Sequence, residues 1–333
     1  MKGAQHSVVP EHLAGVSEGQ SMTALAVVLE RPEQLTLRGL NLSTPNEEDV
    51  VVDIAWSGIS TGTEKLLWTG RMPTFPGMGY PLVPGYESVG RVRSAGTRSG
   101  RQVGDSVFVP GSNCFGPVRG LFGGAAARLV VPGARALPID AKFGERGVLL
   151  ALAATAYHAT SASGTEQPDL IIGHGVLGRL IARLAVLAGA NPMVWETNAG
   201  RREGASSYQV VEPSTDSRRN YHCICDVSGD AGLLDTLISH LAPGGEVVLA
   251  GFYDTPLSFM FAPAFMREAR LRVAAQWQPS DLLAVKELAE SGRLSLDGLI
   301  THRAAATEAD RAYRTAFGDP ACLKMVLDWR SCQ

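Results

Sequence analysis

This chain of 333 residues is poor in cysteine, and the few present follow no recognisable spacing. They are odd in number, scattered, and without a Cys-x-x-Cys pair: Cys114, Cys223, Cys225, Cys322 and Cys332. Such a pattern argues against a disulfide framework and against a structural zinc knot. We therefore expect a cytoplasmic location.

The sequence also lacks a long hydrophobic run and a large excess of one charge. No apolar stretch reaches the roughly eighteen residues that a transmembrane helix needs. A formal net charge of −3 gives no electrostatic attraction to nucleic acid or to an anionic membrane. Residues 1–21 lack the plan of a signal peptide, so we expect a disordered extension there, with Met22 as an alternative start. The remaining chain is long enough for about two domains.

A glycine motif near the middle of the chain carries the strongest functional signal. Gly173, Gly175 and Gly178 have Gly-x-Gly-x-x-Gly spacing, between a short apolar run and an amphipathic one. Glycine at these positions permits a tight turn, the approach of a pyrophosphate and close packing of helix on sheet. A second apolar run, 193–195, is followed directly by Glu196. This context predicts a dinucleotide-binding fold.

Glu196 also bears on which dinucleotide is bound. A carboxylate at this strand end accepts hydrogen bonds from the adenosine ribose and repels the 2′-phosphate of NADP. Arg201 and Arg202 follow closely and would instead attract that phosphate. Because the acid stands at the strand end itself, we predict NAD as the cofactor.

The chain changes character near residue 146. Before it, short β-type runs separated by turn signals predict a folded-over, barrel-like unit: 24–29, 50–57, 88–92, 106–109 and 127–131. After it, helices alternate with strands, which predicts a parallel, doubly wound sheet. Its expected strands are 170–172, 193–195, 222–227 and 246–251, and its expected helices are 147–163, 178–188, 232–241 and 281–291. We therefore expect an α/β protein with a β-rich domain over 22–150, completed by 301–333, and a nucleotide domain over 151–300.

Several short motifs occur in an order found in one enzyme family. They are Val-Pro-Gly-Tyr-Glu-Ser-Val-Gly at 83–90, Val-Gly-Asp-Ser-Val at 103–107, Thr-Ala-Tyr at 155–157, Asp-Val-Ser-Gly at 226–229, Pro-Gly-Gly at 243–245 and Ile-Thr-His at 300–302. Together they resemble the medium-chain dehydrogenase/reductase family over 23–329. The resemblance implies a GroES-like catalytic domain, a Rossmann domain, a reaction in the cleft between them, and a homodimer.

The same resemblance suggests two further cofactor contacts. It implies that Thr155 lies near the nicotinamide and that Lys324 contacts the pyrophosphate. The alternatives are a helix residue bonded to its own backbone for Thr155, and a solvated surface side chain for Lys324.

Hydroxyl groups stand where zinc-dependent members of the family have metal ligands. Ser60 or Thr61 replaces their first cysteine, Tyr86 replaces their histidine, and their structural-zinc segment corresponds to a stretch with only Cys114. Hydroxyls alone do not hold Zn²⁺. We therefore expect a zinc-free member with no bound metal.

Three longer segments, 56–68, 76–88 and 173–179, are similar to a zinc-free branch of the family that acts on a macrocyclic pigment. That resemblance implies NAD-dependent oxidation of a 3-(1-hydroxyethyl) group to 3-acetyl in bacteriochlorophyll biosynthesis. The pigment would arrive from a neighbouring enzyme or from a membrane surface, so the protein would be membrane-associated only through its substrate.

Oxidation of an alcohol without a metal requires a side chain or a water relay to take the hydroxyl proton. The candidate catalytic residues are Tyr86, Ser60 and Thr61, which Glu64 or Glu87 would tune. Alternatively, Tyr86 only fills the vacant metal site, and Glu87 is a structural carboxylate buried against an arginine.

Two clusters of methionine and aromatic residues suit a flat, apolar ligand: residues 71–80 and 258–266. In relatives the second region forms a dimer strand instead. Lys65, Arg71 or Arg267 would pair with the propionate of a chlorophyllide-type ring.

Other histidines and cysteines have structural interpretations. We expect His158 to be a satisfied core residue and His174 to act mainly through its backbone in the phosphate turn. Cys223 and Cys225 are expected to be inert packing on a buried strand.

Two other functions are compatible with the same fold. One is a zinc-free, NADPH-dependent reductase of a quinone or enone, against which Glu196 argues. The other is a non-catalytic, nucleotide-sensing protein that lost its chemistry with the zinc ligands. That second alternative leaves the glycine motif and the apolar clusters unexplained.

Overall fold

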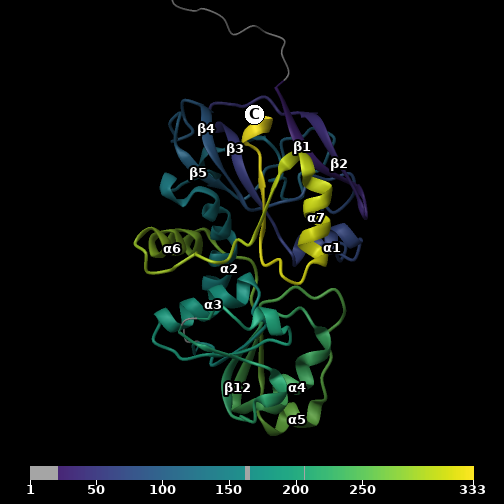
Figure 1. The fold of residues 1–333 in the computed structure, drawn as a ribbon, viewed down its shortest axis with the longest axis vertical. Helices are drawn as coiled ribbons and strands as arrows, with labels where there is room; N and C mark the ends of the chain where they lie inside the picture. Colours follow the sequence, from purple (N-terminus) through teal and green to yellow (C-terminus); the bar gives the residue numbers. More distant parts are fainter. Residues whose placement is uncertain (1–21, 162–165, 206) are drawn as a thin grey trace, which may run out of the picture.

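The computed structural model describes residues 22–161, 166–205 and 207–333, and the predicted extension over 1–21 lies outside this part. The chain forms two lobes (Figure 1). The first contains the N-terminal strands together with the C-terminal elements, and the second contains the middle of the chain. We refer to them as the β-rich lobe and the nucleotide lobe.

The β-rich lobe is built on a seven-stranded sheet in which the two ends of the chain meet. Its strands are β3 (Asp49–Ile59), β4 (Ser88–Ala95), β5 (Ser106–Val109), β6 (Arg128–Pro132), β7 (Leu137–Pro138), β14 (His302–Ala305) and β15 (Met325–Asp328). The C-terminal strand β15 pairs antiparallel with β3, so that Met325 lies opposite Ile59. A hairpin of β1 (Thr23–Arg31) and β2 (Gln34–Asn41) packs beside this sheet. The pairing of β15 with β3 brings residues near 324 next to the end of β3.

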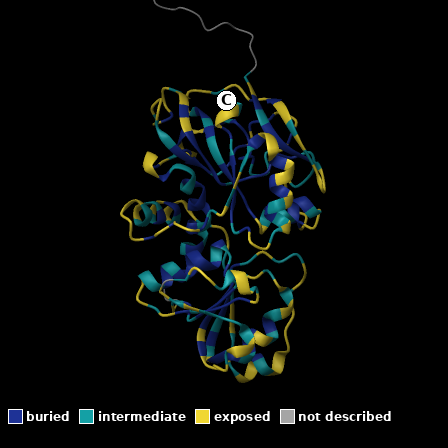
Figure 2. Cartoon of the chain, in the orientation of Figure 1, coloured by how far each residue is buried: buried dark blue, intermediate teal, exposed yellow. Residues whose placement is uncertain are grey.

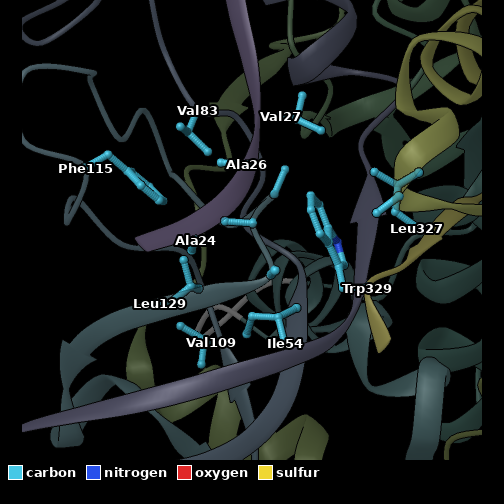
Figure 3. Packing of buried hydrophobic residues seen from close by; sticks show 14 of the residues in the cluster. Ala24, Ala26, Val27, Ile54, Val83, Val109, Phe115, Leu129, Leu327 and Trp329 are labelled. Atoms are coloured by element: carbon cyan, nitrogen blue, oxygen red, sulfur yellow. The ribbon is translucent and has the colours of Figure 1, made fainter. Parts of the chain in front are cut away.

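A buried cluster fills the space between this hairpin and the sheet. Figure 3 shows Trp329 inside a group of aliphatic side chains that includes Ala26, Val27 and Ile54. Trp329 is fully buried, and its indole Nε1 donates to Ser57 Oγ at 2.8 Å. A buried indole with its N–H satisfied contributes apolar area without an unpaired polar group. The cluster therefore anchors the end of the chain beside β3.

The nucleotide lobe is a six-stranded, wholly parallel sheet. In spatial order its strands are β10 (Gln209–Val211), β9 (Met193–Trp195), β8 (Leu170–Ile172), β11 (Tyr221–Asp226), β12 (Leu241–Leu249) and β13 (Arg270–Val273). Numbered within the lobe this order is 3-2-1-4-5-6, the order of dinucleotide-binding sheets. Ligands of such sheets bind outside the carboxyl ends of the strands, where the order reverses.

Helices pack on the sheets of both lobes. They are α1 (Thr63–Thr69), α2 (Leu150–Thr160), α3 (Val176–Leu187), α4 (Leu234–His240), α5 (Phe261–Met266), α6 (Pro279–Glu290) and α7 (Ala309–Gly318). Of these, α1 and α7 lie in the β-rich lobe (Figure 1). Figure 2 shows buried strands at the centre of each lobe and exposed residues on the outer helices. No helix of the described residues is both long and apolar enough to cross a membrane.

The expected α/β architecture is confirmed, with differences in detail. Strands β5, β8 and β9 have the predicted bounds, whereas β2, β10, β13 and β14 were not predicted. The apolar cluster over 258–266 ends in helix α5, and the edge strand of the sheet is β13 instead. A four-residue strand with alternating arginines, as in β13, leaves too short a pattern to identify from sequence.

Candidate active site

The glycine motif forms the turn between β8 and α3. Gly173 has a φ of +100°, which favours glycine. A Cβ on Gly178 would lie 1.9 Å from the Gly173 carbonyl oxygen, so only glycine lets the helix pack against the turn. A Cβ on Gly175 would meet no atom within 4 Å. The start of α3 therefore faces open space, which fits a bound pyrophosphate at the helix N-terminus.

Glu196 lies directly after β9 and faces this turn. Its side chain is buried; Oε2 accepts from the His174 backbone N–H at 2.9 Å, and Oε1 accepts from the Asn198 N–H at 2.8 Å. A carboxylate offers about four acceptor positions, of which these bonds use two. The remaining positions fit the two hydroxyls of an adenosine ribose.

A buried network fixes the loop that follows Glu196. The His174 imidazole lies between the Arg201 carbonyl, 2.6 Å from Nδ1, and the Tyr208 hydroxyl, 2.9 Å from Nε2. Arg179 donates to the carbonyls of Arg201 and Glu203. Burial lowers the pKa of His174 to about 4, so its ring is neutral at pH 7. The His174 side chain thus holds this loop in place. The sequence predicted a role mainly for the His174 backbone.

Arg201 and Arg202 are both bonded within the protein. Arg201 Nε donates to the Pro320 carbonyl at 2.8 Å, which ties the nucleotide lobe to the C-terminal segment of the β-rich lobe. Arg202 forms an ion pair with Glu212 and donates to the Glu196 carbonyl at 3.2 Å. Both guanidinium groups therefore have partners within the protein.

A cluster of hydroxyls lies at the end of β3. The Tyr86 phenol donates to Ser60 Oγ at 2.7 Å and is also hydrogen-bonded to the Thr63 side chain. The Tyr86 ring packs edge-to-face on Phe122, with centroids 5.2 Å apart. Ser60 is buried, whereas Thr61 is exposed and lies outside this cluster. Two predicted residues, Tyr86 and Ser60, are therefore in direct contact.

Thr63 and Phe122 were missed in the sequence analysis. Thr63 lies three residues after Ser60 at the start of α1, so the hydroxyl-rich run over 60–63 was an available signal. Phe122 comes from a distant loop and gave none.

Tyr86 is a hydrogen-bonding group and not a base at neutral pH. Burial of its hydroxyl, together with the nearby charge of Glu87, raises the pKa of the phenol well above its ordinary value. The phenol therefore keeps its proton and can orient an alcohol oxygen placed beside it.

Glu64 supports Ser60 from behind. Its carboxyl is fully buried; Oε1 accepts from the Ser60 backbone N–H at 3.0 Å, and Oε2 accepts from the Tyr313 hydroxyl at 2.7 Å. Loss of hydration raises the pKa of Glu64 to about 7. The carboxyl thus couples the end of β3 to helix α7.

Glu87 and Lys324 form a second buried support. The Lys324 ammonium lies 2.9 and 2.7 Å from the two Glu87 oxygens and donates to the Ile59 carbonyl at 3.2 Å. A Cβ on Gly58 would stand 2.1 Å from Glu87 Oε2, so glycine is required there. Glu87 is the buried structural carboxylate that was one alternative, although its partner is a lysine and not an arginine.

The predicted cofactor contacts of Lys324 and Thr155 stay predictions. Lys324 is only 1% exposed, so the alternative of a solvated surface side chain is wrong. The Thr155 hydroxyl donates to the Ala151 carbonyl at 3.1 Å, within its own helix.

Other predicted features have defined surroundings. His158 is hydrogen-bonded to Asp281 at 2.8 Å but is partly exposed, so it is satisfied without being a core residue. Cys223 and Cys225 are buried on β11, and burial raises the pKa of both thiols, which fits inert packing. Among the described residues, no group of three or more His, Cys, Asp or Glu side chains could hold a metal ion.

The three candidate partners of a substrate carboxylate differ in accessibility. Lys65 Nζ donates to the Phe317 carbonyl at 3.2 Å, and Arg267 donates to the carbonyls of Leu241 and Ser239. Arg71 is exposed and pairs with Asp254 of the other lobe, Nε to Oδ2, at 3.1 Å. Only Arg71 stands in an exposed position at the boundary between the lobes.

The two apolar clusters also differ. In the loop over 71–80, Met72 is buried and Phe75, Met78 and Tyr80 pack against the core of the β-rich lobe. By contrast, seven of the ten exposed large hydrophobic side chains of the described residues lie between 259 and 273, on and around α5 and β13.

Comparison with known proteins connects this geometry to an enzyme family. Residues 46–141 match the family model of the alcohol dehydrogenase GroES-like domain. The chain is 58% identical to the 2-desacetyl-2-hydroxyethyl bacteriochlorophyllide A dehydrogenase of Cereibacter sphaeroides, over 93% of this chain and 99% of that protein. It is 57% identical to the protein of the same name from Rhodobacter capsulatus, over 94% and 100%.

Solved structures share the fold at lower identity. An Escherichia coli alcohol dehydrogenase complexed with NADH superposes with a TM-score of 0.78 at 21% identity, covering 92% of this chain and 99% of that one. A putative zinc-binding dehydrogenase from Sinorhizobium meliloti, bound to NADP, has a TM-score of 0.77 at 22% identity, with the same coverage. Since one neighbour holds NADH and the other NADP, the shared fold does not select between them.

Proposed function

We propose, from the premise that this chain belongs to the bacteriochlorophyllide dehydrogenases of the medium-chain dehydrogenase/reductase family, that it oxidises the 3-(1-hydroxyethyl) group of bacteriochlorophyllide a to 3-acetyl. It is an oxidoreductase acting on CH–OH groups in bacteriochlorophyll biosynthesis. The observation that carries the substrate assignment is the 58% identity along nearly the whole of both chains.

The nucleotide lobe supplies the cofactor site. When bound, NAD⁺ accepts the hydride from the carbinol carbon. The backbone before α3 would hold the pyrophosphate beside Gly175, and Glu196 would accept the ribose hydroxyls. NAD is favoured over NADP because Glu196 repels a 2′-phosphate, while Arg201 and Arg202 are bonded to other groups. Thr155 near the nicotinamide belongs to the same proposal.

The β-rich lobe supplies the hydroxyl cluster. Tyr86 would orient the substrate oxygen. The proton of the substrate hydroxyl would pass to Ser60 and from there through water to solvent, at the exposed Thr61. Overall, the alcohol loses a hydride to NAD⁺ and a proton to solvent, which yields ketone, NADH and H⁺. Glu64 and the Lys324–Glu87 pair hold this cluster in place from behind. Because hydroxyls occupy these positions, we expect turnover without zinc.

The test is turnover by chelator-treated protein. Purified protein is mixed with 3-(1-hydroxyethyl) bacteriochlorophyllide a and either NAD⁺ or NADP⁺, and the red band of the pigment is followed together with reduced cofactor. We expect equal amounts of acetyl pigment and NADH, with NADP⁺ much less effective. No turnover with either cofactor, from protein that still binds NADH, would contradict the assigned reaction and favour the nucleotide-sensing alternative. A clear preference for NADPH and for reduction of an enone would favour the reductase.

We also propose a homodimer formed through α5 and β13. Strand β13 is the edge of the sheet, and the exposed apolar side chains gather beside it. Such an edge and patch are typical of an interface. Light scattering should give twice the chain mass, and Val273→Asp should give a monomer, whereas Val103→Asp, at an exposed valine elsewhere, should stay dimeric. A cytoplasmic location, with pigment taken up at a membrane surface, is part of the same proposal.

A further inference from the structure

The boundary between the lobes carries an ion pair that none of the hydroxyl-cluster chemistry uses. Arg71 follows α1 in the β-rich lobe, and Asp254 follows β12 in the nucleotide lobe. Figure 1 shows α1 at the edge of the β-rich lobe that faces the other lobe, with a loop of the nucleotide lobe reaching toward it. The Arg71 side chain is 63% exposed and that of Asp254 is 21% exposed. A solvated pair of this kind contributes little to stability, which leaves its presence here unexplained by folding.

The backbone of Arg71 is fixed although its side chain is exposed. Gly70 ends α1 in the left-handed conformation, and the Arg71 N–H donates to the Leu66 carbonyl at 3.0 Å. The guanidinium contacts Asp254 through Nε and is otherwise largely open to solvent. A guanidinium whose backbone is fixed, and whose remaining N–H groups face solvent, suits bidentate recognition of a carboxylate.

Arg71 and the hydroxyl cluster stand at opposite ends of one short helix. Thr63, the first residue of α1, is hydrogen-bonded to Tyr86, and Arg71 comes two residues after the last. Seven residues of helix span about 10 Å. A ligand that reaches both ends therefore needs a hydroxyl and an anionic group separated by about the width of a large planar ring.

Asp254 occupies a loop that belongs to the ligand-binding edge of the nucleotide lobe. Its neighbour Tyr253 donates to the buried Asp226 carboxylate at 2.9 Å, and Asp226 ends β11. Phe252, two residues before Asp254, is 48% exposed. Asp254 thus holds a carboxylate against Arg71 at the edge where ligands of this fold bind.

We propose that Arg71 is the anchor for the free propionate of the pigment and that Asp254 is a placeholder which this propionate displaces. The inference rests on the proposed function, since it takes the substrate to be a bacteriochlorophyllide with a free carboxylate. It makes Arg71 the residue that distinguishes the free acid from an esterified pigment. Lys65 and Arg267 suit this role less, because both donate to backbone carbonyls and neither is as exposed as Arg71.

The test compares the free acid with its methyl ester. For the wild type we expect kcat/KM to favour the acid about tenfold, the value of one charge-assisted contact. Arg71→Ala should bring this selectivity close to one, and Asp254→Asn should raise it because the competing carboxylate is gone. Arg98→Ala is the control: Arg98 is also exposed and ion-paired, with Glu47 at 3.1 Å and Glu48 at 3.5 Å, but in the turn between β4 and β5. Its selectivity should equal that of the wild type.

Binding measured by quenching of pigment fluorescence separates the two proposals. If Arg71→Ala lost the same affinity for the acid as for the ester, so that the selectivity stayed unchanged, Arg71 would not be the anchor, while the proposed function would stand. Oxidation of neither pigment would contradict the proposed function, and the acid-to-ester ratio of Kd values would still decide on the anchor. Failure of the wild type to bind either pigment would overturn both. A lower selectivity in Asp254→Asn would contradict the placeholder role.

Discussion

The buried carboxyl of Glu64 should make the protein less stable as the pH rises from about 4.5 to 7, and the substitution Glu64→Gln should remove this dependence. Loss of hydration raises the pKa of Glu64 from 4.5 to about 7. Between these values the unfolded chain releases the proton and the folded chain keeps it. The contribution to stability is therefore complete below pH 4.5 and is lost as the pH rises through about 7.

The size of this effect follows from the shift. One pH unit corresponds to about 1.4 kcal/mol, so the shift corresponds to about 3 kcal/mol of unfolding free energy. Glu64→Gln keeps the shape and removes the titration. We expect the difference in unfolding free energy, variant minus wild type, to rise by about 3 kcal/mol between pH 4.5 and 7.

Urea denaturation at several pH values measures this difference. Contributions from other groups, including His174 with its lowered pKa, occur in both proteins and cancel. Glu48→Gln, at an exposed carboxylate, is the control and should show no such rise. A difference for Glu64→Gln that is flat or falls with pH would refute the reasoning.

Three further predictions concern the cofactor turn and the residues around Tyr86. Gly175→Ala should leave Tm unchanged but weaken NADH binding at least about tenfold, because its methyl group enters the space for pyrophosphate, whereas Gly178→Ala should lower Tm. If thermal unfolding and NADH titration gave the same result for both variants, this interpretation would be contradicted. Lys324→Met should cost about 3–5 kcal/mol by leaving a buried carboxylate unpaired. Adding Glu87→Leu should recover most of the lost stability in urea denaturation. A double variant no more stable than Lys324→Met would contradict the claim that the unpaired Glu87 carboxylate causes the loss. Tyr86→Phe should lower kcat about a hundredfold with the NADH Kd unchanged; a normal kcat would limit Tyr86 to filling space.

The parts of the fold that were predictable depend on local patterns. The glycine motif, the apolar runs of β8 and β9, and Glu196 lie within one short segment whose spacing is set by a single strand–turn–helix–strand unit. The short β-type runs before residue 146 and the family motifs predicted the second lobe.

The supports of the active site could not be predicted in the same way. Glu64 and Tyr313 are 249 positions apart, and Lys324 and Glu87 are 237 apart. These contacts exist because β15 returns to pair with β3, and α7 packs beside them, which no local pattern encodes. The Arg71–Asp254 pair likewise depends on how the two lobes meet. The sequence pointed to Glu64 and Glu87 themselves but not to Tyr313 and Lys324, the distant partners that hold the two carboxyls.

The most direct test of the account is the fate of the hydrogen on the carbinol carbon. Chelator-treated protein would be given NAD⁺ and 3-(1-hydroxyethyl) bacteriochlorophyllide a labelled there with deuterium, and the products analysed by mass spectrometry and NMR. The account predicts one deuterium on C4 of each NADH formed, on a single face, and an equal amount of 3-acetyl pigment. Acetyl pigment without deuterated NADH, or no acetyl pigment from protein that binds both ligands, would contradict it.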